Sequence, residues 1–225
     1  MRTNKRPVRR PSAVGEVRRR QIIDAAVTVL ARDGLSRTSL SRVAEEAGLS
    51  SPGLITYHFA DKDDVLVQLT EDLLATCAAA IEEALRDAPD AMSELLAYID
   101  AFVRFQDQHR DGVRALWRLA SSWKAPGRTD AFDARALAGP VEEILRRGVD
   151  SGEFRELNPA WVAQSVQCSV EGFHELFCAD PRIDTDAFVR ELQELYRRAV
   201  EVEKGGAPRG RASRGRATEE RTQRP

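Results

Sequence analysis

Residues 38–59 read TSLSRVAEEAGLSSPGLITYHF, and this pattern predicts two short helices joined by a tight turn. In the first half, apolar residues recur at i, i+3, i+4 and i+7, which is one face of a helix: Leu40, Val43, Ala44 and Ala47. Either Thr38 or Ser39 can cap the start of this helix. Gly48 supplies the permissive backbone at which it ends.

The second helix of the pair is predicted to start at Ser51, which can cap it, with Pro52 in the first turn, where a missing N–H costs nothing. Leu54, Ile55 and Phe59 form its expected buried side. Such a pair is typical of a helix-turn-helix, whose second helix enters the DNA major groove. Short helix pairs with a glycine turn also occur in proteins that never bind DNA. Whether this pair binds DNA is therefore judged from the identity of its residues and of those that flank it.

The residues that decide are Gly34, Thr38, Ser39, Val43, Ala44, Ala47, Gly48, Leu49, the run from Ser51 to Phe59, and Lys62. On these residues, the stretch from Arg18 to Leu69 resembles the TetR family of bacterial transcriptional regulators. The chain departs from the family pattern at Ser50, an extra turn residue, at Pro52 in place of a common lysine, and at Arg42 in place of an acidic residue. The resemblance implies an all-α fold of about nine helices. An N-terminal three-helix, helix-turn-helix DNA-binding domain would precede a C-terminal helical domain for ligand binding and dimerisation.

The expected DNA contacts combine the outward side of the second helix with positions that the family uses to grip phosphate. Gly53 lets the backbone approach DNA closely, and Thr56 can reach a base edge or a thymine methyl group. The N–H groups that begin the preceding helix suit a phosphate as well. The predicted contact residues are Thr38, Ser39, Arg42, Ser51, Pro52, Gly53, Thr56, Tyr57, His58 and Lys62.

Charge is distributed unevenly along the 225 residues. Residues 1–62 carry 12 Lys and Arg against 6 Asp and Glu, residues 63–203 carry 15 against 28, and residues 204–225 carry 7 against 2. The three net charges, +6, −13 and +5, sum to the −2 of the whole chain. A basic end on an acidic body points to nucleic acid, although a solvated acidic face with charged tails would give the same counts.

Four segments follow from this pattern: a basic flexible arm (1–17), a helix-turn-helix DNA-binding domain (18–64), an effector-binding and dimerisation domain (65–203) and an Arg-rich disordered tail (204–225). Helical spacing and capping residues predict the remaining helices. Their expected bounds are Glu16–Arg32, Lys62–Arg86 with Asp61 and Asp64 as a capping pair, Ala91–His109, Val113–Trp123 after a turn at 110–112, Asp130–Val149 with a kink or break at Gly139-Pro140, Pro159–Cys178 capped by Asn158, and a last helix from Asp184 or Thr185 to Glu203.

The resemblance also implies a homodimer built on the last two helices and an effector pocket in the helices before them. The interface residues expected are Trp161, Ser165, Cys168, Gly172, Phe173, Leu192, Leu195 and Tyr196. The pocket residues expected are Phe102, Phe105, Gln106, His109, Arg114, Trp117, Trp123 and Phe132. The alternative for both sets is ordinary packing within one protomer. A pocket of this composition suggests a mostly apolar or aromatic effector.

The leading function is therefore a ligand-responsive homodimeric repressor of a palindromic operator, released by a small-molecule effector. An activator, or a regulator without a ligand, is a variant of this function. Cys77, Cys168 and Cys178 are widely spaced, which argues against a zinc site or a disulfide framework. No cofactor or metal is expected, and an all-helical enzyme is disfavoured because no nucleophile or phosphate-loop motif appears. An RNA- or nucleoid-associated protein stays open. No apolar run is long enough to span a membrane, so we expect a cytoplasmic protein.

Overall fold

The structure is a computed structural model that describes residues 13–123 and 134–202. These residues form ten α-helices and one short 3₁₀ helix, η1, and their one β contact is an isolated bridge between Phe154 and Glu201. The elements are α1 (Ala13–Asp33), η1 (Leu35–Arg37), α2 (Leu40–Glu46), α3 (Gly53–Thr56), α4 (Lys62–Leu85), α5 (Ala91–Gln108), α6 (Arg110–Ser122), α7 (Ala134–Asp150), α8 (Pro159–Glu171), α9 (Phe173–Ala179) and α10 (Thr185–Val200). The all-α prediction is confirmed.

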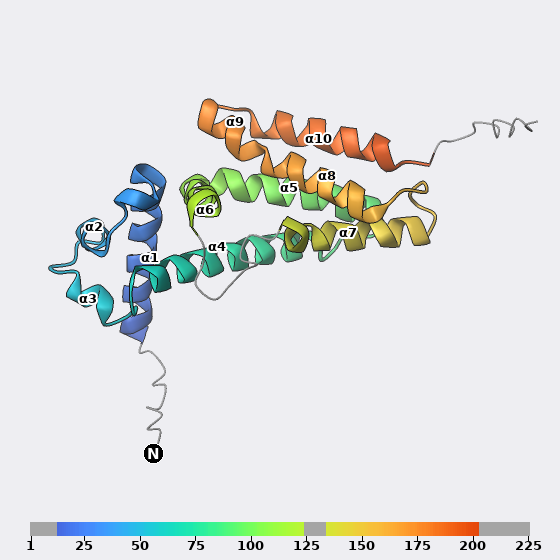
Figure 1. Ribbon diagram of the computed structural model, residues 1–225. Helices are drawn as coiled ribbons and strands as arrows, with labels where there is room; N and C mark the ends of the chain where they lie inside the picture. The colour runs from blue at the N-terminus through green and yellow to red at the C-terminus, as the bar shows by residue number, and fades with distance from the viewer. Residues whose placement is uncertain (1–12, 124–133, 203–225) are drawn as a thin grey trace, which may run out of the picture.

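The helices divide into a small head and a long body, with α4 running from one into the other (Figure 1). In the head, α2 and α3 lie on the side of α1 away from the body. Buried apolar residues form two clusters. One joins α1, α2, α3 and the start of α4 to Ala115 and Leu119 of α6. The other lies between α5, α7, α8, α9 and α10 and includes Ile81 of α4 and Val113 of α6. Helix α6 therefore connects the head to the body.

The start of α4 is fixed by the predicted reciprocal capping pair. The Asp61 carboxylate accepts a hydrogen bond from the Asp64 N–H at 2.9 Å, and the Asp64 carboxylate accepts one from the Ala60 N–H at 2.9 Å. The two bonds satisfy backbone donors that the first helical turn leaves unpaired. This cap fixes the start of the long helix directly after the recognition segment, which comprises α3 and its flanks (residues 51–59).

The second helix of the helix-turn-helix is shorter than its sequence predicts. It begins at Gly53 with Pro52 at the capping position, and no side chain caps it, so the expected cap by Ser51 is wrong. The Ser51 carbonyl oxygen instead accepts the Leu54 N–H at 3.2 Å, which makes Pro52 part of a turn. Leu54 was expected on the buried side but is 45% exposed, whereas Ile55 and Phe59 are buried as expected.

The junction of α5 and α6 contradicts the predicted turn at residues 110–112. The helix breaks at His109 (φ −121°, ψ 38°), and Arg110 already begins α6. Gly112 lies inside α6, where the Leu73 side chain of α4 packs against it, and a Cβ at this position would stand 2.6 Å from a Leu73 methyl carbon. Here the glycine leaves room for the Leu73 side chain and does not mark a turn.

Two further helix boundaries differ from expectation. A kink or a break was expected at Gly139-Pro140, and α7 continues across Pro140, which excludes the break. The helix expected over 159–178 is divided at Gly172 into α8 and α9. This division gives one helix more than the nine predicted. None of the helices in residues 13–123 and 134–202 combines the length and apolar character needed to cross a bilayer.

Candidate nucleic-acid interface and ligand cavity

The turn between α2 and α3 has the geometry that a helix-turn-helix requires. Gly48 adopts a positive φ of 63°, a conformation that other residues rarely take. The Leu49 N–H donates to the Ala44 carbonyl at 2.8 Å and the Gly48 N–H donates to that of Glu45 at 3.0 Å. These two bonds satisfy carbonyls at the end of α2 and turn the chain sharply into α3. The predicted helix end at Gly48 is confirmed.

Helix α3 and its flanks expose one face and bury the other. The residues left exposed are Ser51, Pro52, Gly53, Leu54, Thr56 and Tyr57, with Tyr57 85% exposed. Ile55 is fully buried on the opposite face. The Thr56 hydroxyl donates to the Gly53 carbonyl at 2.9 Å, and its oxygen lone pairs stay available to a donor from outside. Ser51, Gly53 and Thr56 keep part of this face small, which suits close approach to base edges.

An arginine that the sequence analysis did not single out holds this recognition segment in place. The Arg19 guanidinium donates to the His58 carbonyl oxygen and, at 3.0 Å, to the Gln68 side chain of α4. Its Cζ lies 4.2 Å above the centre of the Phe59 ring. Arg19 thus ties α1 to the end of the recognition segment and to α4 through three contacts. Its position in the run Arg18–Arg20 concealed this role among exposed basic residues.

His58 lies half-buried beside the exposed Tyr57, with the two ring centres 5.1 Å apart and the ring planes nearly perpendicular. Burial, followed by the positive charges of Arg19 and Arg18, lowers the pKa of His58. The imidazole is therefore neutral at neutral pH and available as a hydrogen-bond donor or acceptor, not as a cation.

The predicted contacts at the start of α2 divide into one structural residue and two outward ones. Thr38 is only 4% exposed and its hydroxyl donates to the Gly34 carbonyl at 2.9 Å, so it supports the turn into α2. Ser39 caps α2, where its side chain accepts the Arg42 N–H. Arg42 is exposed, with its guanidinium 2.9 Å from the Asp33 carboxylate. Lys62, the first residue of α4, is half-buried.

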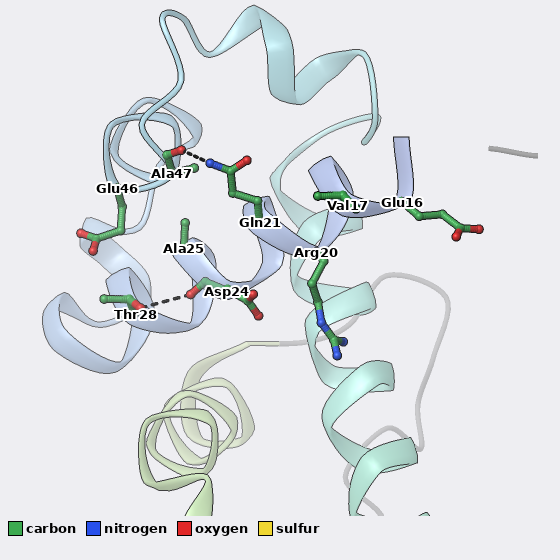
Figure 2. A pocket seen from close by; sticks show the side chains of 9 residues that line it. All are labelled: Glu16, Val17, Arg20, Gln21, Asp24, Ala25, Thr28, Glu46 and Ala47. Atoms are coloured by element: carbon green, nitrogen blue, oxygen red, sulfur yellow. Dashed lines mark hydrogen bonds between the residues drawn. The ribbon is translucent and has the colours of Figure 1, made fainter. Parts of the chain in front are cut away.

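A wide open groove lies between α1 and the end of α2 (Figure 2). The Gln21 side-chain amide donates across it to the Ala47 carbonyl at 2.6 Å, and the Arg32 guanidinium reaches the Glu46 carboxylate at 2.9 Å near one end of α1. These contacts fix the position of α2 on α1. Together with Arg19, they make the head a rigid support for the exposed face of α3.

The body contains an apolar cavity of about 250 Å³ between α4, α5, α6 and the end of α8. Its lining is Leu73, Leu74, Cys77, Phe102, Phe105, Gln106, Val113, Leu116, Trp117, Ala120 and Glu171. Burial raises the pKa of Cys77 to about 12, so its thiol is protonated and the wall stays uncharged there. The predicted residues Phe102, Phe105, Gln106 and Trp117 meet at this cavity.

The other predicted pocket residues lie elsewhere. His109 faces a separate hollow between α1 and α4, and Arg114 pairs with Asp111 and lies over the Phe177 ring. Trp123 packs against the core of the head and donates its indole N–H to the Asp63 carboxylate at 3.1 Å. Phe132 lies outside the described residues. Glu171 was missed because α8 was assigned to the dimer interface alone.

The predicted dimer residues separate into an exposed stripe and a buried pair. On α8, Trp161, Ser165 and Cys168 are exposed at i, i+4 and i+7, followed by the half-buried Gly172. On α10, Leu195 is 56% exposed and Leu192 is half-buried. Phe173 and Tyr196 belong to the core of the body, and the Tyr196 hydroxyl lies within hydrogen-bond distance of Ser165 and Ser169.

Comparison with known proteins places this geometry in a family. The sequence profile "Bacterial regulatory proteins, tetR family" matches residues 22–69, which span the helix-turn-helix and the start of α4. The HTH-type transcriptional regulator BetI of Vibrio vulnificus is 34% identical over 162 residues, covering 70% of this chain and 79% of that protein. Across the first curated relatives, the matched regions span 62% to 79% of the relative's length.

Solved structures share the fold beyond the head. PfmR, a TetR family transcriptional regulator from Thermus thermophilus, matches with a TM-score of 0.70 at 24% identity, over 82% of this chain and 97% of that one. FadR of Bacillus subtilis, solved in complex with stearoyl-CoA, matches with a TM-score of 0.63 at 22% identity, over 78% and 96%. The helix-turn-helix, the profile match and the similarity across most of the chain together show that this protein belongs to the TetR family of bacterial transcriptional regulators.

Proposed function

We propose that this DNA-binding transcriptional regulator is a homodimeric repressor that binds a palindromic operator and leaves it when a small molecule fills the body cavity. Family membership excludes the enzyme considered from the sequence, since these proteins are regulators. The proposal assigns residues 18–64 to DNA binding and residues 65–203 to effector binding and dimerisation. It places the protein in the cytoplasm, where bacterial DNA is.

One observation carries the proposed ligand response: α6 contributes residues both to the wall of the cavity and to the core of the head. Leu116, Trp117 and Ala120 line the cavity, while Ala115 and Leu119, on another face of the same helix, lie in the core of the head. A ligand that displaces α6 would therefore move the wall of the cavity and the support of the head together.

The hydrogen bond from Trp123 to Asp63 extends this connection to the first turn of α4, directly after the recognition segment. If the protein with α6 in its ligand-bound arrangement binds DNA more weakly, the ligand lowers the affinity for the operator. By linkage, the operator then lowers the affinity for the ligand by the same factor. A coupling of about 1–3 kcal/mol, roughly 5- to 150-fold in operator affinity, is typical of such systems.

The proposed dimer rests on the exposed apolar surface of α8 and α10. Trp161, 77% exposed, and Leu195 lie on this surface, and burial of such side chains against a second copy would stabilise a symmetric interface. Two heads related by a two-fold axis require an operator that is an inverted repeat, with half-sites separated by about one helical turn or a multiple of it.

To test the ligand response, operator binding and tryptophan fluorescence are followed together while ligands are titrated. Trp117 at the cavity wall should report binding. A ligand that releases the operator in the same concentration range as the fluorescence change supports the proposal. If every ligand that changes the fluorescence leaves operator affinity untouched, the cavity and the DNA site are uncoupled, and the proposed repressor is not ligand-responsive.

Replacing Lys62 by alanine should weaken binding to all DNA sequences alike, because an ammonium group at this position would contact phosphate and not a base. The slope of log affinity against log salt should fall by roughly one. The measurement is a salt titration on operator and on unrelated DNA. Arg86→Ala, at the far end of α4, is the matched control. A loss confined to operator DNA would show that Lys62 reads sequence instead.

A further inference from the structure

Among the described residues that line the cavity in the body, Glu171 at the last position of α8 is the single acidic one. The other described lining residues are apolar or aromatic except Gln106 and the protonated thiol of Cys77. The Gln106 amide is itself engaged, since it donates to the Val170 carbonyl at 2.7 Å. Within the described lining, the charge is therefore that of one carboxylate.

Buried polar groups hold that carboxylate in place. The Gln167 amide donates to Oε1 of Glu171 at 2.7 Å, and the Tyr98 hydroxyl donates to the Gln167 carbonyl oxygen at 2.6 Å. Gln167 and Tyr98 are both fully buried. Burial, followed by the nearby Cys77 and Glu171, raises the pKa of Tyr98, so its hydroxyl keeps the proton that it donates. This chain of hydrogen bonds from uncharged groups fixes the orientation of Glu171.

No described basic side chain lies within ion-pair distance of Glu171. Two arginines of α6, Arg110 and Arg114, pair with Asp107 and Asp111 and lie over the Phe177 ring. His109 packs against Phe105, and burial lowers the pKa of its imidazole, which favours the neutral form. Within the described residues, the carboxylate has no counter-charge from the protein.

The aromatic walls complete a site for a positive charge. Phe102, Phe105 and Trp117 line the same cavity as Glu171. The Trp117 indole is held by a parallel stack on His174, with ring centres 4.3 Å apart and planes 10° apart. The faces of aromatic rings attract an organic cation, and more strongly where water is excluded. A carboxylate beside such faces adds a direct charge interaction.

We propose that this cavity binds an organic cation with a compact apolar or aromatic body, and that Glu171 is its counter-charge. The inference rests on the proposed ligand-responsive function and names the class of effector for it. The volume of about 250 Å³ lies below the roughly 300–1,000 Å³ usual for drug-sized ligands, which favours a small molecule. An anionic ligand would be opposed by Glu171 and would meet no basic group among the described lining residues.

The test uses the full-length protein and three probes in calorimetry: benzyltrimethylammonium, its uncharged carbon isostere neopentylbenzene, and the anion decanoate. The two isosteres have the same shape, so their difference isolates the charge. The cation should bind about tenfold or more tightly than the neutral isostere, a difference of about 1.4 kcal/mol or more. Equal binding of the two, or tighter binding of decanoate, overturns the proposal without reference to any variant.

Glu171→Gln should weaken binding of the cation by about tenfold and leave the affinity for the neutral isostere nearly unchanged. The variant should keep the local structure, because glutamine retains an oxygen that can accept a hydrogen bond from Gln167. Glu82→Gln, on the exposed face of α4, makes the same charge change away from the cavity and should alter neither the affinity for the cation nor that for the neutral isostere. Equal losses in the two variants would point to long-range charge alone and would contradict a direct contact.

Operator release is measured separately with the same probes, so that the two proposals can fail independently. If decanoate alone binds and releases the operator, the ligand-responsive regulator stands and the cation site is wrong. If the cation binds through Glu171 but no probe changes operator affinity, the cation site stands and the ligand response is wrong.

Discussion

Replacing Phe59 by alanine should destabilise the head by about 3–5 kcal/mol and abolish DNA binding at physiological temperature. Phe59 is 2% exposed, lies in the core cluster of the head and is covered by the Arg19 guanidinium. Its removal leaves a cavity and also removes one of the three contacts that hold Arg19 over the recognition segment. Denaturant unfolding and operator binding of the same preparation measure the two effects.

Leu54→Ala is the matched control, because the two residues lie on the same short segment but Leu54 is 45% exposed. Its effect on stability should stay within about 0.5 kcal/mol. If the two variants destabilise the protein equally, the assignment of buried and exposed faces to α3 is wrong. The control therefore tests the direction in which the recognition helix points.

The double variant Trp161→Glu, Leu195→Glu should convert the protein to a monomer of 25.0 kDa and weaken operator binding by about 10²- to 10⁴-fold. Both side chains are exposed in the protomer, so the changes should leave its own folding intact. The affinity falls because each head then binds its half-site without the second head held nearby. Sedimentation analysis and operator titration give the two readouts.

A control at Ala84, exposed on α4, introduces the same kind of charge away from this surface. Ala84→Glu should keep the dimer and its affinity. A double variant that still sediments at twice the protomer mass would show that α8 and α10 are not the interface. The exposure of Trp161 and Leu195 would then need an explanation other than dimerisation.

The parts of the fold that could be predicted from the sequence are those decided by neighbouring residues. Asp61 with Asp64, Asn158 before Pro159, and Gly48 after Ala47 each act within one helical turn. Their hydrogen bonds depend on spacing along the chain alone. The exposed face of α3 followed from the same local pattern.

The remaining features depend on contacts between distant segments. Gly112 packs against the Leu73 side chain inside α6, and Trp123 donates its indole N–H to Asp63, sixty residues earlier, instead of lining the ligand cavity. Glu171 enters the cavity from a helix that also carries the exposed stripe of the proposed dimer surface. A helix with two functional faces gives no sequence signal for the second one, so this residue required the three-dimensional arrangement.

The central claim, a symmetric two-headed regulator of a specific operator, is tested most directly by selecting genomic fragments bound by the purified full-length protein and footprinting the best of them. Two protected half-sites, related by inversion and separated by about one helical turn or a multiple of it, are the expected result. Fragments bound without sequence preference, or a footprint without two-fold symmetry, would contradict the account and favour a nucleoid- or RNA-associated protein.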